Sequence, residues 1–388
     1  MNSRVYLDWN ATAPLRSEAR RAMLHAFDLA GNPSSVHSEG RAARAIVEKA
    51  RGALAHALNV TAGDVVFTSG GTEANALALA PGLRIAGGAA IERLIVSAVE
   101  HPSVLSGGRF SRDRIALAPV TGQGVIDIQA LTKLLASGPP ALVSVMLANN
   151  ETGAVQPISE VASLVHEAGG ILHVDAVQAL GRIPIDMRAL GADLATVSGH
   201  KIGGPKGVGA LIVVNGRLEG LPPLIAGGGQ ERNRRAGTEN VSGIAGFGAA
   251  IETATTSLAT ERERQTRLRD QLETGLRSIP GARIFADGVA RLPNTVLFAA
   301  PGLKSETAVI AFDLEGIAVS AGSACSSGKI QPSHVLSAMA VPPELARGAV
   351  RLSLGCGTEE RDIVRCIEAW IKLATVLLKG DETQVERF

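Results

Sequence analysis

One lysine in this sequence follows a strand-like run and precedes a glycine-rich stretch. Residues 193–197 are mostly apolar and predict a short buried strand, after which Ser198, Gly199, His200 and Lys201 follow directly. The glycines beyond them give a permissive backbone, so this lysine can approach a ligand closely. A primary amine forms Schiff bases with carbonyl groups, while hydroxyls and free amides hold phosphate. These residues suit an aldehyde cofactor that carries a phosphate, although a solvated lysine on a surface loop has the same pattern.

A second glycine-rich turn, at residues 70–73, separates a predicted strand from a predicted helix. Gly71 offers a flexible backbone and Thr72 a hydroxyl beside the first amides of the helix, and such an end of a helix binds phosphate. A plain helix cap would have the same residues. The turn is not a nucleotide P-loop, because the sequence contains no G-x-x-x-x-G-K-[ST] motif.

Three polar residues come directly after other apolar runs. Asp175 ends a predicted buried strand, where a carboxylate needs a cationic partner unless it caps the next helix. His101 could stack on a ligand or protonate it, and Asn150 could orient a ligand hydroxyl. Both of the latter residue types also occur as structural parts of turns, so the two interpretations stay open.

An arginine and a cysteine near the C-terminal end complete the set of candidates. Arg351 interrupts an apolar strand-like run, and a buried guanidinium matches a carboxylate, either of a substrate or of the protein itself. Cys325 lies among small residues in a Gly/Ser-rich loop, where a thiol is accessible. Cys356 and Cys366 are expected to be packed or incidental.

The elements that must position these residues alternate between strand and helix. Amphipathic helices are predicted over residues 15–29 and 38–58. The predicted strands are residues 65–67, 94–96, 142–147, 171–174, 193–197 and 210–214. Such alternation with Val/Ile/Leu-rich strands indicates a mostly parallel sheet covered on both faces, and ligands bind at the carboxyl ends of its strands. The polar clusters should therefore converge on one crevice.

The pattern changes after residue 240. One long charged helix is predicted over residues 240–279, and a second α/β pattern follows with a strand at 294–298 and a helix at 305–314. We place the boundary inside the long helix. The expected division is a large domain of residues 13–257 and a small domain of residues 1–12 and 258–388.

Composition excludes several classes of function. The 388 residues carry 38 basic and 37 acidic side chains, a net charge of +1, which gives no support for nucleic-acid or membrane binding by bulk charge. No run of 18 apolar residues or signal-peptide pattern is present, and three cysteines are too few for a disulfide framework. A cytoplasmic protein without a metal site is expected.

Several motifs occur in an order typical of one family. They are Ser-Gly-His-Lys, Thr-Ser-Gly-Gly-Thr-Glu, Glu-His-Pro, Ala-Asn-Asn-Glu-Thr-Gly, His-Val-Asp-Ala-Val-Gln, Arg-Arg-Ala-Gly-Thr-Glu-Asn and Gly-Ser-Ala-Cys-Ser-Ser-Gly. Together they resemble the NifS/IscS-like cysteine desulfurases of the class V aminotransferase family, from Tyr6 to about residue 375. The resemblance implies the pyridoxal 5'-phosphate (PLP) transferase fold of type I. The run Ala74-Asn75-Ala76 departs from the acidic residue and asparagine that relatives often carry after the second motif, and we interpret that difference as one of helix packing.

The resemblance also implies a role for each candidate. Lys201, rather than Lys206 beyond it, carries the cofactor as a Schiff base, and Cys325 accepts the sulfur. His101 stacks on the cofactor ring and takes part in proton transfer. The remaining expected cofactor contacts are Gly71, Thr72, Ser198 and His200 at the phosphate, Asp175 at the ring nitrogen, Gln178 and Asn150 at the ring hydroxyl, and Thr238 from the other subunit of a homodimer. The substrate carboxylate is expected at Arg351, with Asn32 and Asn150 beside it.

The activity implied by the resemblance is conversion of L-cysteine to L-alanine, with a persulfide left on Cys325. Its sulfur would pass to an acceptor protein for iron–sulfur cluster assembly or other sulfur-containing products. The alternatives are a selenocysteine lyase or a class V aminotransferase on the same cofactor, and a non-catalytic sulfur-relay or scaffold module.

Overall fold

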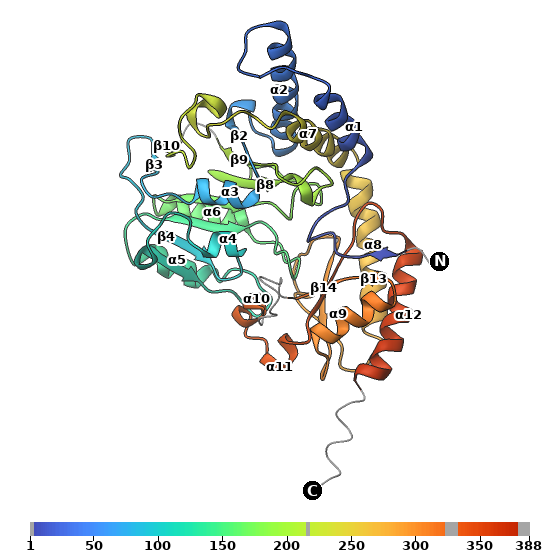
Figure 1. The fold of residues 1–388 in the computed structure, drawn as a ribbon. Helices are drawn as coiled ribbons and strands as arrows, with labels where there is room; N and C mark the ends of the chain where they lie inside the picture. Colours follow the sequence, from blue (N-terminus) through green and yellow to red (C-terminus); the bar gives the residue numbers. More distant parts are fainter. Residues whose placement is uncertain (1–3, 215–217, 323–332, 379–388) are drawn as a thin grey trace.

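The computed structural model describes residues 4–214, 218–322 and 333–378 (Figure 1). Its larger sheet has seven strands in the order β2-β9-β8-β7-β6-β4-β5. The strands are β2 (Val65–Thr68), β4 (Leu94–Ser97), β5 (Ile115–Ala118), β6 (Leu142–Met146), β7 (Ile171–Asp175), β8 (Leu194–Ser198) and β9 (Gly209–Val213). Only β9 runs against its neighbours, because the connection from β8 is too short for a crossover helix. The prediction of a mostly parallel sheet is confirmed.

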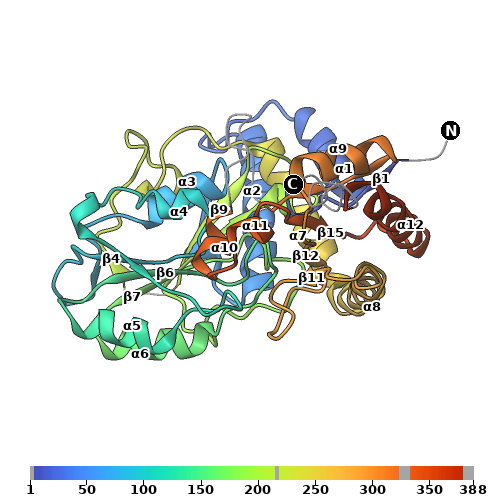
Figure 2. The ribbon, with the colours of Figure 1, turned by 90° about the horizontal axis from the view of Figure 1, so that it is seen from below.

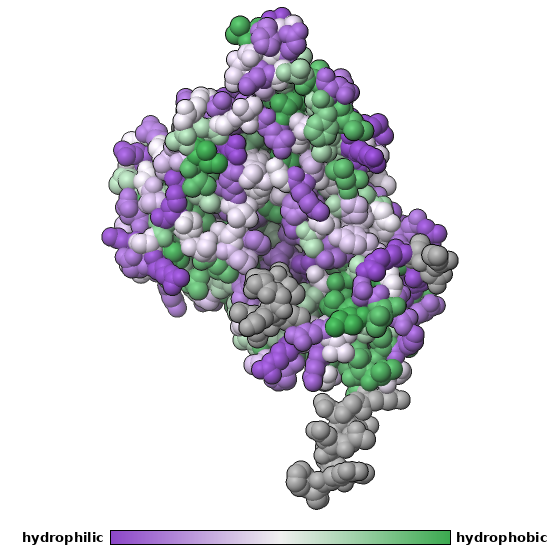
Figure 3. Space-filling model, viewed as in Figure 1, coloured by the Kyte–Doolittle hydropathy of each residue, from purple (hydrophilic) through white to green (hydrophobic). Residues whose placement is uncertain are grey.

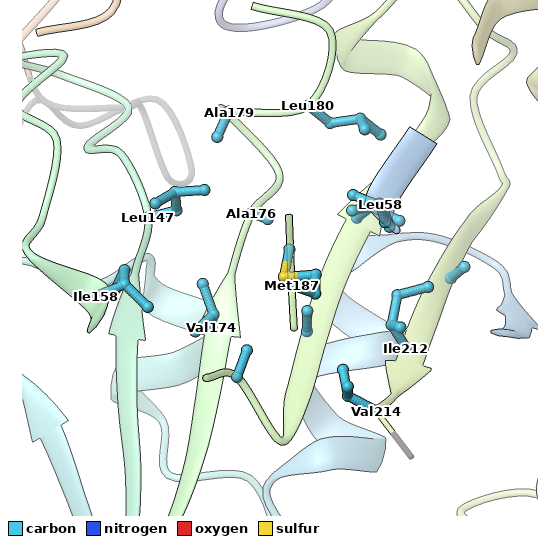
Figure 4. Close-up of a cluster of buried hydrophobic side chains, with 14 of the residues drawn as sticks. Leu58, Leu147, Ile158, Val174, Ala176, Ala179, Leu180, Met187, Ile212 and Val214 are labelled. Atoms are coloured by element: carbon cyan, nitrogen blue, oxygen red, sulfur yellow. The ribbon is translucent and has the colours of Figure 1, made fainter. Parts of the chain in front are cut away.

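Helices cover both faces of this sheet (Figure 2). On one face lie α2 (Ser38–Leu58), α5 (Ile128–Ala136), α6 (Ile158–Glu167) and α7 (Val241–Thr256), with α1 (Ser17–Phe27) against α7. On the other lie α3 (Gly71–Ala78) and α4 (Pro102–Leu105). Successive strand residues alternate between the two apolar layers, since Val174 belongs to one cluster and Ile171 to the other. Met187 fills the middle of the first layer, with Leu58 and Val174 around it (Figure 4).

The smaller sheet is antiparallel, with the order β11-β12-β15-β14. Its strands are β11 (Arg283–Ile284), β12 (Thr295–Ala299), β14 (Ser320–Ala321) and β15 (Val350–Ser353), and its helices are α8 (Leu258–Leu276), α9 (Ser305–Leu314) and α12 (Glu360–Leu377). Trp370 packs edge-on against Phe298 in the core. The N-terminal strand β1 (Val5–Tyr6) joins this part by pairing with β13 (Ile317–Ala318). Ile310 and Leu314 stay exposed in the apolar patch over α9 (Figure 3).

Short elements complete the described chain. They are β3 (Arg84–Ile85) paired with β10 (Leu218–Glu219), helices α10 (His334–Ala338) and α11 (Pro343–Ala346), and 3-10 turns η1 (Ala62–Asp64), η2 (Arg112–Arg114), η3 (Gly199–Lys201) and η4 (Gln230–Asn233). η3 is the turn that carries the candidate lysine.

The prediction of one helix over residues 240–279 is wrong. Two helices are present, and Ser257 separates them with φ −92° and ψ 1°. α7 packs against α1 and α2, whereas α8 packs against α12 and β12. Because of the break, α7 and α8 can pack in two different hydrophobic cores. We propose that the boundary between the two domains lies at Ser257.

Candidate active site

The residues predicted to hold a phosphate line one cavity of about 420 Å³ at the carboxyl end of β8. Gly71 and Thr72 come from the first turn of α3, and Ser198 and His200 come from the end of β8. A Cβ atom at Gly71 would lie 3.1 Å from a methyl group of Val177, so glycine lets the first turn of α3 pack closely against that residue. The structure therefore brings all four predicted phosphate residues together. The other lining residues are Ala11, Thr12, Ser69, Gly70, Glu73, Lys206 and Gly207.

Lys201 lies at the end of η3, with its amine turned toward the N-terminal segment. Its Nζ donates hydrogen bonds to the carbonyl oxygens of Asn10, at 2.7 Å, and Ala11, at 2.9 Å. Burial, followed by the positive charges of Arg351 and Arg182, lowers the pKa of this amine from 10.5 to about 7. Near neutral pH the lysine can therefore exist as a free amine, the form that attacks carbonyl carbon.

Asp175 is buried at the end of β7, beside Thr196 of β8. Its Oδ1 accepts a hydrogen bond from the backbone N–H of Val177, and its Oδ2 accepts one from Asn75 Nδ2 at 2.9 Å. The amide of Asn75 also donates to Ser103 Oγ at 2.9 Å. Our interpretation of Asn75 as a packing residue missed this contact. A buried asparagine on a helix gives no sequence signal for a particular partner.

His101 caps the N-terminus of α4, where its Nδ1 accepts a hydrogen bond from the backbone N–H of Ser103. The residue is exposed, yet partial burial of its ring lowers its pKa. The positive charges of Lys201 and His334 act in the same direction, and the charge of Asp175 opposes them. The neutral form of His101 is therefore favoured, and the pKa of the ring depends on the charges of both Asp175 and Lys201.

Arg351 lies on β15, and its guanidinium contacts two segments that are distant in the sequence. Its Nη2 donates to Asp8 Oδ1 at 2.7 Å, and its Nη1 donates to the carbonyl oxygen of Asn150 at 3.1 Å. Its Nε has no hydrogen-bond partner within the described chain. The internal ion pair that the sequence left open is thus present, and Asn150 contributes its backbone to the arginine. Asp8 was not among the predicted site residues.

Gln178 is buried, and both ends of its side-chain amide are engaged. Nε2 donates to the carbonyl oxygen of Asn10 at 3.1 Å, and Oε1 accepts from the guanidinium of Arg182. The same carbonyl oxygen of Asn10 accepts a hydrogen bond from Lys201 Nζ, so Gln178 helps to fix the N-terminal segment that contacts the lysine. Nε2 has a second hydrogen and Oε1 a second lone pair, so the predicted contact with a cofactor can be made without breaking these bonds.

Comparison with known proteins agrees with this geometry. The family described as aminotransferase class-V matches residues 5–366. This chain belongs to the class V aminotransferase family. It is 43% identical to the cysteine desulfurase IscS of Dictyoglomus turgidum over 368 residues, which cover 94% of this chain and 92% of that protein. The NifS-like protein of Rickettsia africae ESF-5 superposes with a TM-score of 0.86 at 37% identity, covering 96% of this chain and 99% of that one. A protein solved as SspA in complex with cysteine has a TM-score of 0.72 at 29% identity, covering 90% and 98% of the two chains.

Members of this family are PLP-dependent enzymes, and the residues at the cavity fit that cofactor. Amides and hydroxyls of the α3 turn and the β8 end suit the phosphate, and the amine of Lys201 suits the aldehyde. Asp175 offers a carboxylate to a protonated ring nitrogen. The described residues hold no cluster of side chains that could bind a metal ion, and none of their helices is long and apolar enough to cross a membrane.

Of the predicted site residues in the described part of the chain, Gly71, Thr72, Ser198 and His200 line the cavity and the others do not. Thr238 is exposed and does not line it. Asn32 is exposed in the connection between α1 and α2 and does not line it either. Cys325 lies outside the described residues. Of the other cysteines, Cys366 is buried in α12, where burial raises the pKa of its thiol to about 12, and Cys356 is exposed.

The arginine-rich segment that carries Thr238 has partners inside the chain. Arg235 pairs with Glu73 at 2.9 Å, and the buried Glu231 pairs with Arg51 at 2.7 Å. Arg232 donates to the carbonyl oxygen of Gly63 at 2.7 Å. The charges of this segment are therefore explained in part without a second subunit.

Proposed function

We propose that this chain is a PLP-dependent cysteine desulfurase that converts L-cysteine to L-alanine and leaves the sulfur as a persulfide on Cys325. The observation that carries the proposal is Lys201, an amine of pKa about 7 at the end of β8, next to a phosphate-type cavity. The names of the relatives support the choice of cysteine as substrate.

The predicted cofactor and substrate contacts have the following proposed tasks. Lys201 binds the cofactor, Gly71, Thr72, Ser198 and His200 hold its phosphate, and Asp175 pairs with its ring nitrogen, with Gln178 and Asn150 at the ring hydroxyl. When bound, PLP supplies an electron sink for the bonds at the substrate α-carbon. Arg351 binds the substrate carboxylate. Asn32, which is exposed in the connection between α1 and α2, is proposed to assist Arg351 at this carboxylate.

The sulfur transfer balances without an oxidant. The thiolate of Cys325 forms a bond to the substrate sulfur, the carbon–sulfur bond of cysteine breaks, and the carbon gains a proton to give alanine. Lys201 is suited to move that proton, because its pKa of about 7 lets it hold or release one at neutral pH. Cys325 keeps the sulfur as a persulfide, which an acceptor thiol can then attack.

The proposed unit is a cytoplasmic homodimer in which Thr238 completes the phosphate site of the partner subunit. The exposure of Thr238 away from its own cavity supports this arrangement. Mixing tests it: Lys201→Ala and Thr238→Asp subunits, each weakly active alone, should form a heterodimer with one intact site. A purified heterodimer that shows no recovery would assign Thr238 to its own subunit. The acceptor is expected to be a thiol-bearing protein of iron–sulfur cluster assembly or a related sulfur pathway.

The experiment that tests the activity is replacement of Cys325 by serine. The variant should keep the visible absorption of the bound cofactor and lose sulfide and alanine formation from cysteine. Full sulfur release by Cys325→Ser would contradict the proposal. Preference for selenocysteine would point to a lyase, amino-group transfer to a keto acid would point to an aminotransferase, and absence of cofactor absorption in the wild type would point to a non-catalytic module.

A further inference from the structure

A chain of hydrogen bonds connects Asp175 to His101 across three elements. Asn75 Nδ2 of α3 donates both to Asp175 Oδ2 at the end of β7 and to Ser103 Oγ of α4, each at 2.9 Å. Ser103 Oγ lies 2.7 Å from His101 Nδ1, and the backbone N–H of Ser103 lies 3.1 Å from the same nitrogen. The direction of each bond can be worked out, because some of these groups can only donate and others only accept.

The orientation of the Asn75 amide is fixed by its carboxylate neighbour. An ionised carboxylate accepts hydrogen bonds and donates none, so the NH₂ group of Asn75, and not its oxygen, must face Asp175. That NH₂ group has two hydrogens, one for Asp175 and one for Ser103. In this orientation the Oδ1 atom of Asn75 is buried without a hydrogen-bond partner within the described chain. The orientation therefore has an energetic cost, which the two bonds donated by the NH₂ group offset.

The orientation of Asn75 constrains the serine hydroxyl and then the histidine ring. Ser103 Oγ accepts from Asn75, and its own hydrogen is free to point at His101 Nδ1. The backbone N–H of Ser103 points at the same nitrogen and can only donate. A hydrogen on Nδ1 would oppose that N–H and leave it unpaired in the first turn of α4, where no intrahelical acceptor exists.

We infer that Asn75 and Ser103 are positioning residues that hold His101 in the neutral tautomer with its hydrogen on Nε2. Two donors then converge on the lone pair of Nδ1. Nε2 presents an N–H to its surroundings and has no lone pair with which to take a proton. His101 is thereby a hydrogen-bond donor, and removal of a proton from the substrate falls to Lys201.

The charges that face His101 are compatible with this tautomer. Asp175 of β7 favours a charged ring, while Lys201 of η3 and His334 of α10 disfavour it, and burial adds to their effect. His334 Nε2 donates to the carbonyl oxygen of Glu100 at 2.9 Å, so it is committed to another group. The proton assignment depends on the hydrogen bonds alone, and its meaning for catalysis rests on the proposed function.

Nitrogen NMR of histidine-labelled protein tests the assignment. The full chain without cofactor and the holoenzyme are both measured, and loss of one signal in His101→Gln identifies the residue among the eight histidines. We expect ring signals of an unprotonated Nδ1 and a protonated Nε2 in both forms. Ser103→Ala removes one bond that stabilises the neutral ring, so the pKa of His101 should rise by about 0.4–1 unit. Ser103→Thr keeps a hydroxyl and should restore the wild-type value.

Ser106→Ala is the matched control, since this serine of the same turn donates to the backbone of Ser103 and does not contact the ring. It should leave the pKa of His101 unchanged. A protonated Nδ1 in the wild type would overturn the inference, as would equal pKa values in Ser103→Ala and the wild type. These readouts do not require turnover, so an inactive enzyme with the expected tautomer would contradict only the proposed function.

Discussion

Replacement of Glu151 by glutamine should change how the stability of this protein depends on pH. Glu151 follows β6 and is fully buried, and Ser333 Oγ donates to its Oε2 at 2.5 Å. Burial raises the pKa of this carboxyl group from 4.5 to about 7, against the opposing effects of Ser333 and Arg351. The folded protein therefore binds a proton on Glu151 that the unfolded chain has already released at pH 6.

The sign and size of the effect follow from proton linkage. Between the unfolded and folded pKa values the native state binds more protons, so its stability falls as the pH rises. For pKa values of 4.5 and 7 the loss between pH 5 and pH 8 is about 2.5 kcal/mol. Glutamine resembles the protonated acid and can accept the bond from Ser333, but it does not titrate. Between pH 5 and pH 8, the free energy of unfolding of Glu151→Gln should therefore rise by about 2.5 kcal/mol relative to that of the wild type.

Urea unfolding of both proteins at pH 5 and pH 8 measures the difference. All other titrating groups are shared by the two proteins, so their contributions cancel in the comparison. Glu368→Gln, at an exposed position of α12, is the matched control and should show no such pH-dependent gain. Parallel loss of stability in the wild type and Glu151→Gln would refute the assignment of a neutral carboxyl group to Glu151.

Three further predictions concern the site and the segment next to it. Lys201→Ala should lose both the visible absorption of bound cofactor and turnover, whereas Lys206→Ala should keep the absorption, because Lys206 is exposed at the cavity rim. Arg351→Lys keeps the charge but loses the planar fork, so kcat/KM for cysteine should fall about ten- to hundredfold, and unchanged kinetics would leave Arg351 as a partner of the protein alone. Glu231→Gln leaves the guanidinium of Arg51 buried without its anion, which should lower the free energy of unfolding by about 3–5 kcal/mol. Urea unfolding checks this, and a loss below 1 kcal/mol would contradict it.

The residues that follow strands were predictable because strand ends in a parallel sheet meet at one edge. Lys201, Asp175 and Ser198 each follow a short apolar run, and periodicity locates such runs well. The glycine-rich turn at Gly71 has a similar local signal. For these positions, the residues near them in the sequence were enough to place them together.

The contacts that the sequence did not predict join residues far apart in the chain. Asp8 meets Arg351 only because β1 pairs with β13 and the following residues run beside β15. The end of α7 at Thr256 has no proline or glycine to mark it, since the break is set by two different packing surfaces. Neither the ion pair nor the helix break has a local signature that a single sequence could reveal.

Two buried carboxyl groups near the cavity, Glu100 and Asp175, differ in their surroundings. Glu100 is completely buried and accepts one hydrogen bond, from the backbone N–H of Met146 at 2.6 Å. Burial raises its pKa well above the ordinary value, and the negative charge of Asp175 raises it further. Asp175 accepts two hydrogen bonds, from Val177 and Asn75. A neutral Glu100 therefore places no second negative charge beside Asp175, which keeps this site suited to a protonated cofactor ring.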